Sequence, residues 1–166
     1  MDEQTFRWVD PAQVLAENAK FSGLEYMQRA LDGAIPPPPI AVLMQMSVLE
    51  VGPGKVVFGC LPSHAHYNPI GMVHGGLVCT LLDTVTGCAA HTTLAAGVGY
   101  TSIEIKVNYL RPVLADTGQL TATGLVIKGG KRVIFAEGNV VTSAGDLVAT
   151  ASSTLLVVPR PDPAVA

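Results

Sequence analysis

A single carboxylate inside a long apolar segment is the feature of this sequence that points most directly to chemistry. From Leu77 to Ala96 the chain runs LVCTLLDTVTGCAAHTTLAA, which contains no proline and one charged residue, Asp83. The segment is too long for an ordinary strand, so it is predicted to form a mostly buried helix. An ionised carboxylate is costly to remove from water, and no Lys or Arg lies within one helical turn to pair with it. The carboxylate therefore requires a partner or a function.

Paired glycines, Gly75 and Gly76, stand directly before this helix. Glycine lets backbone N–H groups approach a ligand closely, and a helix N-terminus favours negative charge. A helix start that can bind an electrophile, with a carboxylate two turns further along, indicates an active site. Two simpler interpretations stay open: the glycines form only a tight turn, and Asp83 lies on a solvated polar stripe of the helix.

The composition restricts the class of protein. A chain of 166 residues is long enough for one domain with a substantial core. Apolar residues make up 49% and charged residues 14%, which argues against disorder and predicts that oligomerisation buries further surface. The net charge of −3 leaves no basic surface for nucleic acid.

The three cysteines, Cys60, Cys79 and Cys88, favour a cytoplasmic location. They are odd in number, lack a Cys-x-x-Cys spacing and lie in apolar contexts, so they are expected to be buried, reduced thiols. The first ten residues are acidic and polar rather than secretory in pattern. Because the long apolar segment also carries Asp83 and His91, no membrane span is expected.

The remaining pattern is that of an α+β protein with an antiparallel sheet and the long helix on one face. Residues 10–33 predict one or two short helices, because Pro11 suits a first helical turn and Asp32-Gly33 suits a stop. Strands are expected at roughly 41–52, 54–61, 102–109, 117–128, 131–143 and 146–158, mostly joined by hairpin turns. Alternation in 102–109 predicts that Ile103, Ile105, Val107 and Tyr109 share one buried face.

We expect two parts along the chain. Residues 1–39 are predicted to form an N-terminal helical extension, which ends in a stiff proline-rich connector at Pro36 to Pro39. Residues 40–166 are predicted to form the main domain. The connector is interpreted as a tether that holds the helices against this domain.

The motifs around the helix resemble those of the hotdog-fold acyl-CoA thioesterases, especially the phenylacetate-pathway (PaaI-type) and 4-hydroxybenzoyl-CoA thioesterases. The resemblance rests on Asn68-Pro69-x-Gly71-x-x-His74-Gly75-Gly76, on Asp83 nine residues after the histidine, and on Lys106-Val107-Asn108-Tyr109-Leu110-Arg111-Pro112. It implies a sheet that wraps around a long central helix. It also implies a homodimer or homotetramer with active sites at the subunit interface.

The resemblance implies roles for the residues at the helix. Asp83 would act as general base for water or attack the thioester directly, while the Gly75 N–H, beside Gly76, would polarise the carbonyl. Asn68 and His74 would order the loop or the carbonyl, opposite an Asp83 from the other subunit, although a purely structural role for the histidine stays open. Thioester hydrolysis needs a base or nucleophile and donors for the oxyanion, but no metal or cofactor.

The position of the lytic water is less defined by the resemblance. Some relatives hold this water with a Ser or Thr on the following strand, and Thr101 or Ser102 falls near that position. Other relatives use a Thr one helical turn after the carboxylate, where this chain has Gly87.

Two clusters of cations are candidates for contact with the phosphates of coenzyme A. Lys128, Lys131 and Arg132 surround a Gly-Gly turn, where a solvated hairpin tip is the alternative interpretation. Arg111, followed by a rigid proline, is the other candidate. The pair His64-x-His66 has no further ligand nearby, so no metal site is expected.

The sequence therefore predicts hydrolysis of a small or aromatic acyl-CoA to the free acid and coenzyme A. Two other functions stay open. A hotdog hydratase or dehydratase would be expected to pair a catalytic His with an acid in different motifs. A non-catalytic acyl-CoA-binding module would share the same residues but release no thiol.

Overall fold

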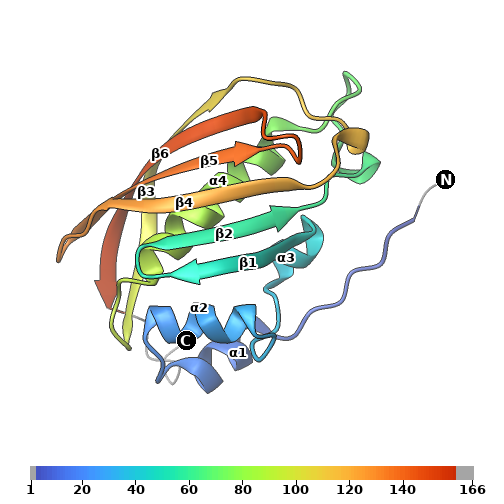
Figure 1. Cartoon of the computed structure of the whole chain (residues 1–166). Coiled ribbons are helices and arrows are strands. Elements are labelled where there is room, and N and C mark those ends of the chain that lie inside the picture. Colours follow the sequence, from blue (N-terminus) through green and yellow to red (C-terminus); the bar gives the residue numbers. More distant parts are fainter. Residues whose placement is uncertain (1–2, 160–166) are drawn as a thin grey trace.

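The computed structural model describes residues 3–159 and consists of one antiparallel sheet packed against one long helix (Figure 1). The elements in chain order are α1 (Pro11–Asn18), α2 (Gly23–Leu31), α3 (Pro39–Leu43), β1 (Met46–Gly52), β2 (Lys55–Cys60), α4 (Gly75–His91), β3 (Val98–Tyr109), β4 (Leu120–Lys128), β5 (Val133–Val141) and β6 (Leu147–Pro159). Short 3₁₀ turns lie at His64–His66 and Ala115–Thr117. The predicted α+β hotdog architecture, with a long central helix inside the sheet, is confirmed.

The sheet has six strands in the order β1-β2-β4-β5-β6-β3. Every neighbouring pair is antiparallel, which agrees with the hairpin turns expected between most of them. The first strand, β1, forms one edge of the sheet, and β3, which directly follows α4, forms the other edge. Among the described strands β3 pairs only with β6, so none of them covers its outer side.

The helix α4 approaches the sheet closely because two glycines face it. Gly124 in β4 and Gly138 in β5 are directly opposite each other across the two strands. A Cβ atom added at Gly124 would overlap the backbone carbonyl of Val85, and one at Gly138 would lie 3.2 Å from Leu82 Cδ2 and Thr86 Cγ2. The middle of the helix therefore rests in a depression of the sheet that side chains would fill.

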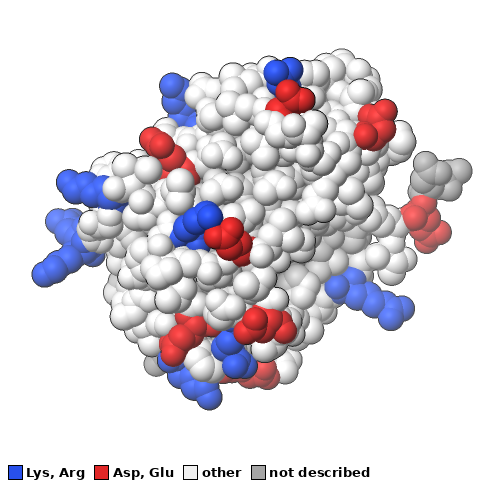
Figure 2. All heavy atoms as spheres, in the orientation of Figure 1, with Lys and Arg blue, Asp and Glu red and all other residues white. Residues whose placement is uncertain are grey.

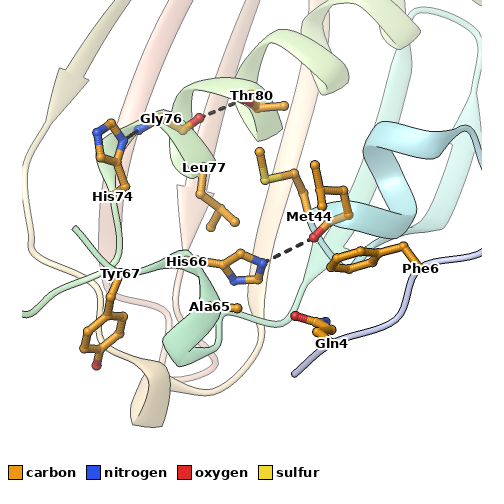
Figure 3. A pocket seen from close by; sticks show the side chains of 11 residues that line it. Gln4, Phe6, Met44, Ala65, His66, Tyr67, His74, Gly76, Leu77 and Thr80 are labelled. Atoms are coloured by element: carbon orange, nitrogen blue, oxygen red, sulfur yellow. Dashed lines mark hydrogen bonds between the residues drawn. The ribbon is translucent and has the colours of Figure 1, made fainter. Parts of the chain in front are cut away.

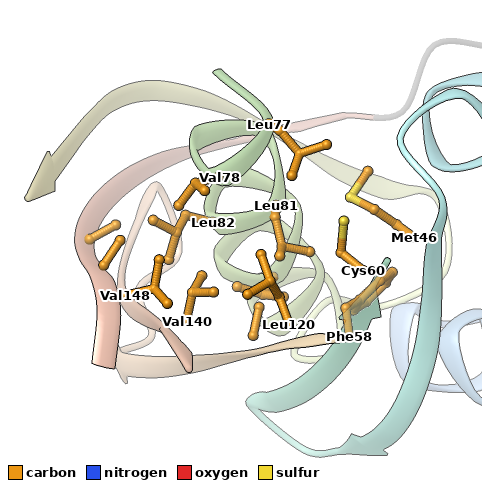
Figure 4. Close-up of a cluster of buried hydrophobic side chains, with 14 of the residues drawn as sticks. Met46, Phe58, Cys60, Leu77, Val78, Leu81, Leu82, Leu120, Val140 and Val148 are labelled. Carbon is orange, nitrogen blue, oxygen red and sulfur yellow. The ribbon is translucent and has the colours of Figure 1, made fainter. Parts of the chain in front are cut away.

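The core lies between α4 and the inner face of the sheet (Figure 4). Leu81, Leu82 and Val85 on the helix are fully buried, and so are Leu120 and Val140 on the facing strands. Buried helix positions recur at the spacing of an amphipathic helix, so a second, less buried stripe is left over. That stripe carries Asp83 and is the side of α4 that faces β3.

The N-terminal region forms the two predicted short helices. Asp10 caps α1 by accepting a hydrogen bond from Ala12 N at 2.9 Å, and Pro11 occupies the first turn as expected. The α2 helix packs on β1 and α4 and contributes Met27 to the main core. The domain boundary at 39/40 stays a prediction, although α2 is part of one continuous core with the sheet.

Two predicted boundaries were wrong near the proline-rich connector. Pro39 does not continue the extended connector but begins α3, because proline is well suited to the first turn of a helix. The first strand consequently starts at Met46 rather than at residue 41. Gln45, with a positive φ of 52°, separates the end of α3 from the strand.

The predicted alternation in the strand after the helix was also partly wrong. A β-bulge between Ser102 and Glu104 leaves Ile103 out of the pairing with β6, and this side chain is 56% exposed. Ile105 and Val107 do pack against the core as expected. Because the bulge shifts the alternation by one residue, Ser102 before it faces the helix on the same side as Ile105 after it.

No helix within residues 3–159 is both long and apolar enough to cross a membrane.

Substitution of Gly124 by Ala is expected to lower the free energy of unfolding by about 3 kcal/mol, because the added methyl group meets helix backbone that cannot rotate away. Urea denaturation followed by circular dichroism would measure the change. Gly52→Ala is the matched control, since a Cβ there has no atom within 4 Å. Equal denaturation midpoints for the two variants would contradict the close approach of α4 to the sheet.

Candidate active site

The less buried stripe of α4 forms the floor of an open hollow. Gly76, Thr80 and Asp83 lie on one helix face because they are spaced by four and three residues. With Ser102 and Glu104 from β3 they line a space of about 570 Å³. Asp83, the predicted candidate, is thus not buried in the core but lies in a hollow between α4 and the edge strand β3.

Asp83 has a hydrogen-bond partner on β3. The Ser102 hydroxyl donates to Asp83 Oδ1 at 2.7 Å, and the second carboxylate oxygen is left for another donor. Thr101, the other residue proposed from the sequence, is adjacent to Ser102 and so points to the opposite face of the strand. Of the two candidates, only Ser102 is brought to the carboxylate.

His74 holds the start of α4. As the N-cap residue it accepts a hydrogen bond at Nδ1 from Gly76 N at 2.8 Å. Gly75 N–H, the first donor of the helix, has no acceptor within residues 3–159. The two neighbouring glycines therefore differ: the N–H of Gly76 is used by the cap, whereas that of Gly75 is open to a ligand at the positive end of the helix.

Gly75 also permits a close contact with β3. The Tyr109 hydroxyl donates to Gly75 O at 3.2 Å, and a Cβ at Gly75 would lie 3.3 Å from the tyrosine ring. Burial, together with the nearby Cys79 thiol, raises the pKa of Tyr109 above its usual value, so the hydroxyl stays protonated and able to donate at neutral pH. Tyr109 thus fixes the helix start from the outside, a role that the sequence analysis missed.

Asn68 orders the loop that leads into α4. Its side-chain oxygen accepts hydrogen bonds from Ile70 N at 3.1 Å and Met72 N at 3.2 Å. Its backbone N–H donates to Met72 O at 2.8 Å. These hydrogen bonds order the loop, which is one of the two roles expected for Asn68. Asn68 and Gly75 line the same hollow, which has a volume of about 350 Å³.

The donor and the carboxylate lie far apart in one chain. Gly75 and Asp83 are eight residues apart on the same helix, so they are separated by about 12 Å along its axis. That distance is too great for both groups to act on one carbonyl carbon. A single chain therefore carries the two halves of the expected chemistry in two separate hollows.

Tyr100 is a second residue that the sequence analysis missed, although its position two residues before Ser102 places it on the same strand face. A Cβ at Gly87, one helical turn after Asp83, would lie 2.6 Å from the Tyr100 hydroxyl. This hydroxyl therefore fills the space where a side chain at position 87 would be. Burial raises the pKa of Tyr100 well above its usual value, and the nearby Cys88 and Asp83 side chains add to the effect.

Two of the three cysteines, Cys60 and Cys88, are poorly suited to act as nucleophiles. Burial raises the pKa of the Cys60 thiol to about 11 and that of the Cys88 thiol to about 12, so both are protonated at neutral pH. Cys60 is buried in the core as expected. Cys79 and Cys88 were also expected to be buried, but both are only partly buried. Cys88 packs against the core, whereas Cys79 lines the hollow of Asp83.

The candidate cations are divided between the two ends of α4. Arg111 lines the hollow of Gly75 and forms an ion pair with Asp146 at 3.4 Å, with both side chains more than half exposed. Lys128, Lys131 and Arg132 lie on the β4–β5 hairpin, near the other end of the helix. Figure 2 shows Lys and Arg side chains gathered at the edge of the molecule where Figure 1 places this hairpin.

Groups of three or more metal-binding side chains are absent from the described part of the chain. The two loop histidines are used structurally: His66 Nδ1 accepts from Ser63 N at 3.0 Å, and the ring of His64 packs against Tyr67 at 4.9 Å between centroids.

Comparisons with known proteins show the family of this chain. The family described as "Thioesterase superfamily" matches residues 70–149, which include α4 and every catalytic candidate except Asn68. Acyl-coenzyme A thioesterase 13 of Homo sapiens is 31% identical over 115 residues, which cover 68% of this chain and 80% of the human protein. The protein of the same name from Pongo abelii matches to the same extent.

Solved structures share the fold. The PaaI protein from the phenylacetic acid degradation operon of E. coli has a TM-score of 0.73 at 20% identity, covering 84% of this chain and 98% of that chain. A putative thioesterase from Ralstonia eutropha, described as related to phenylacetic acid degradation, has a TM-score of 0.72 at 29% identity, covering 79% and 98%. This chain belongs to the thioesterase superfamily, a family of hotdog-fold thioester hydrolases.

Proposed function

We propose that this protein hydrolyses an acyl-CoA thioester to the free acid and coenzyme A, with Asp83 and the Gly75 N–H as the reacting groups. The observation that carries the proposal is the open Gly75 N–H beside a capped Gly76 N–H, because an unused donor at a helix start suits a developing oxyanion. The human relative named acyl-coenzyme A thioesterase 13 and a Streptococcus mutans protein solved with acetyl CoA support coenzyme A as the carrier.

The reaction needs both hollows at once. In the proposed mechanism the Gly75 N–H binds the thioester oxygen, and Asp83 either takes a proton from the attacking water or attacks the carbonyl carbon itself. The tetrahedral oxyanion then collapses, and the thiolate of coenzyme A leaves and is protonated. When water is the attacking group, this collapse gives the free acid directly. When Asp83 attacks, it leaves a mixed anhydride on Asp83, which a water molecule hydrolyses to the free acid and the restored carboxylate. The Ser102 hydroxyl, which donates to one oxygen of Asp83, orients the carboxylate and leaves its second oxygen for water.

Self-association would bring the two groups together. One chain separates Gly75 from Asp83 by about 12 Å along the helix, so we propose that each site combines the Gly75 of one subunit with the Asp83 of another. The open outer edge of β3 supports a contact on this side, because Ile103 and Tyr109 are 56% and 55% exposed there. A two-fold axis through such a contact would produce two equivalent sites.

Thiol release from a panel of acyl-CoAs tests the activity, with the Asp83→Asn variant measured beside the native protein. We expect turnover by the native protein and a loss of at least about 100-fold in kcat in the variant, because the base or nucleophile is removed while the shape is kept. Asp116→Asn, at an exposed 3₁₀ turn, is the control. Alkene formation or hydration instead of thiol release would indicate a hydratase, and tight binding without turnover a binding module.

The oxyanion donor is tested by Gly75→Pro, which removes the N–H at a helix position where proline is tolerated. The preceding His74, at φ −63° and ψ 134°, already has the extended conformation that proline requires. We expect kcat to fall about 100- to 1,000-fold. Gly75→Ala is the matched control, because it introduces the same Cβ contact with Tyr109 but keeps the donor; equal losses in both variants would contradict the role of the N–H.

The shared site is tested by mixing the two inactive variants. Refolding Asp83→Asn together with Gly75→Pro in equal amounts is expected to restore about a quarter of the native activity, since half of the dimers are hybrids and each hybrid has one intact site. The separately refolded variants are the control. No recovery, with hybrids demonstrated by mass spectrometry, would show that both groups must come from one chain.

A further inference from the structure

Gln4 and Phe6 of the N-terminal segment form one wall of a pocket beside the helix start (Figure 3). The pocket has a volume of about 570 Å³ and is walled on one side by Phe6 and Met44 and on the other by Leu77 and His74. It shares Gly76 and Thr80 with the hollow of Asp83. Gly75 itself lines the neighbouring hollow, but His74 and Gly76, which flank it in sequence, both line the pocket, so the pocket lies beside the proposed oxyanion donor.

The pocket is apolar and uncharged in character. None of its lining residues, all of which belong to the described part of the chain, is Lys, Arg, Asp or Glu. Its polar side chains are largely used by backbone: His66 binds Ser63 N, the Tyr67 hydroxyl accepts from Ala115 N at 3.0 Å, and the Thr80 hydroxyl donates to Gly76 O at 2.8 Å. A ligand inside the pocket therefore meets mainly carbon atoms.

Phe6 is the residue that encloses the far end of the pocket. Residues 3–10 form no helix or strand, yet Phe6 is partly buried, whereas Trp8 in the same segment is 59% exposed. Figure 3 shows the Phe6 ring next to Met44, with Gln4 beside it, at the end of the pocket away from Gly76. The distance from Gly76 to this aromatic ring thus sets the length available to a ligand.

We infer that this pocket receives the acyl group of the substrate and that Phe6 determines specificity for uncharged, apolar acyl groups of aryl or medium-chain size. The inference rests on the proposed thioester hydrolysis and names the substrate class for that site. An acyl group that carries a free carboxylate at its far end is excluded, because the charge of this carboxylate would be desolvated without a partner. A two-carbon acyl group is too short to reach Phe6.

The test compares matched acyl-CoAs on Phe6→Ala, Trp8→Ala and the native protein. For Phe6→Ala we expect KM to rise about 5- to 10-fold with phenylacetyl-CoA and hexanoyl-CoA and to stay within about twofold with acetyl-CoA. Trp8→Ala, in the same segment but outside the pocket, is expected to match the native protein with all three. Adipoyl-CoA differs from hexanoyl-CoA in having a carboxylate in place of the terminal methyl group. On the native protein its kcat/KM is expected to be lower than that of hexanoyl-CoA by about 100-fold or more.

The outcomes separate this inference from the proposed function. Equal effects of Phe6→Ala on acetyl-CoA and hexanoyl-CoA, or equal use of adipoyl-CoA and hexanoyl-CoA, would overturn the acyl pocket while leaving hydrolysis intact. If no acyl-CoA is hydrolysed, the proposed function fails, and calorimetric Kd values for the same acyl-CoAs then replace KM. The same 5- to 10-fold selective weakening would still support the pocket, and its absence would reject it.

Discussion

The close contact between α4 and the sheet is the constraint on which the other features depend. Gly124 and Gly138 lie side by side in adjacent strands. A Cβ at Gly124 would overlap the helix backbone, and one at Gly138 would press on helix side chains. The helix is therefore held at one depth and one rotation by backbone packing as well as by the fully buried leucines around it. A helix fixed in this way presents its remaining polar stripe in a defined direction, toward the edge strand β3.

This rigid placement explains why the site residues come from few elements. The loop ending at His74 and the first three turns of α4 supply the open donor and the carboxylate, and β3 supplies the side chains that hold them in place. Ser102 and Tyr109 lie on either side of the bulge and both face the helix. The bulge thus allows one strand to orient Asp83 at one point and the helix start at another.

The residues most predictable from sequence were those whose type conflicts with their surroundings. Asp83 in an apolar helix and Gly75 at its start stand out because an unpaired charge and a missing side chain have few structural explanations. Ser102 and Thr101 could not be distinguished, since a bulge changes which alternate residues face inward and leaves no clear mark in the sequence. Phe6 could not be assigned either, because an irregular segment has no periodicity from which its position over the pocket follows.

The cap formed by His74 has a consequence for the protonation of its ring. Nδ1 accepts a hydrogen bond from Gly76 N, so this nitrogen must carry a lone pair, and the neutral ring carries its proton on Nε2. A proton added to Nδ1 would face another N–H group, and the first turn of α4 would lose its cap. His74 consequently cannot pass protons through Nδ1 without loosening the helix start beside Gly75. The imidazole serves the neighbouring backbone as a fixed acceptor, and its one remaining donor points away from the helix it caps.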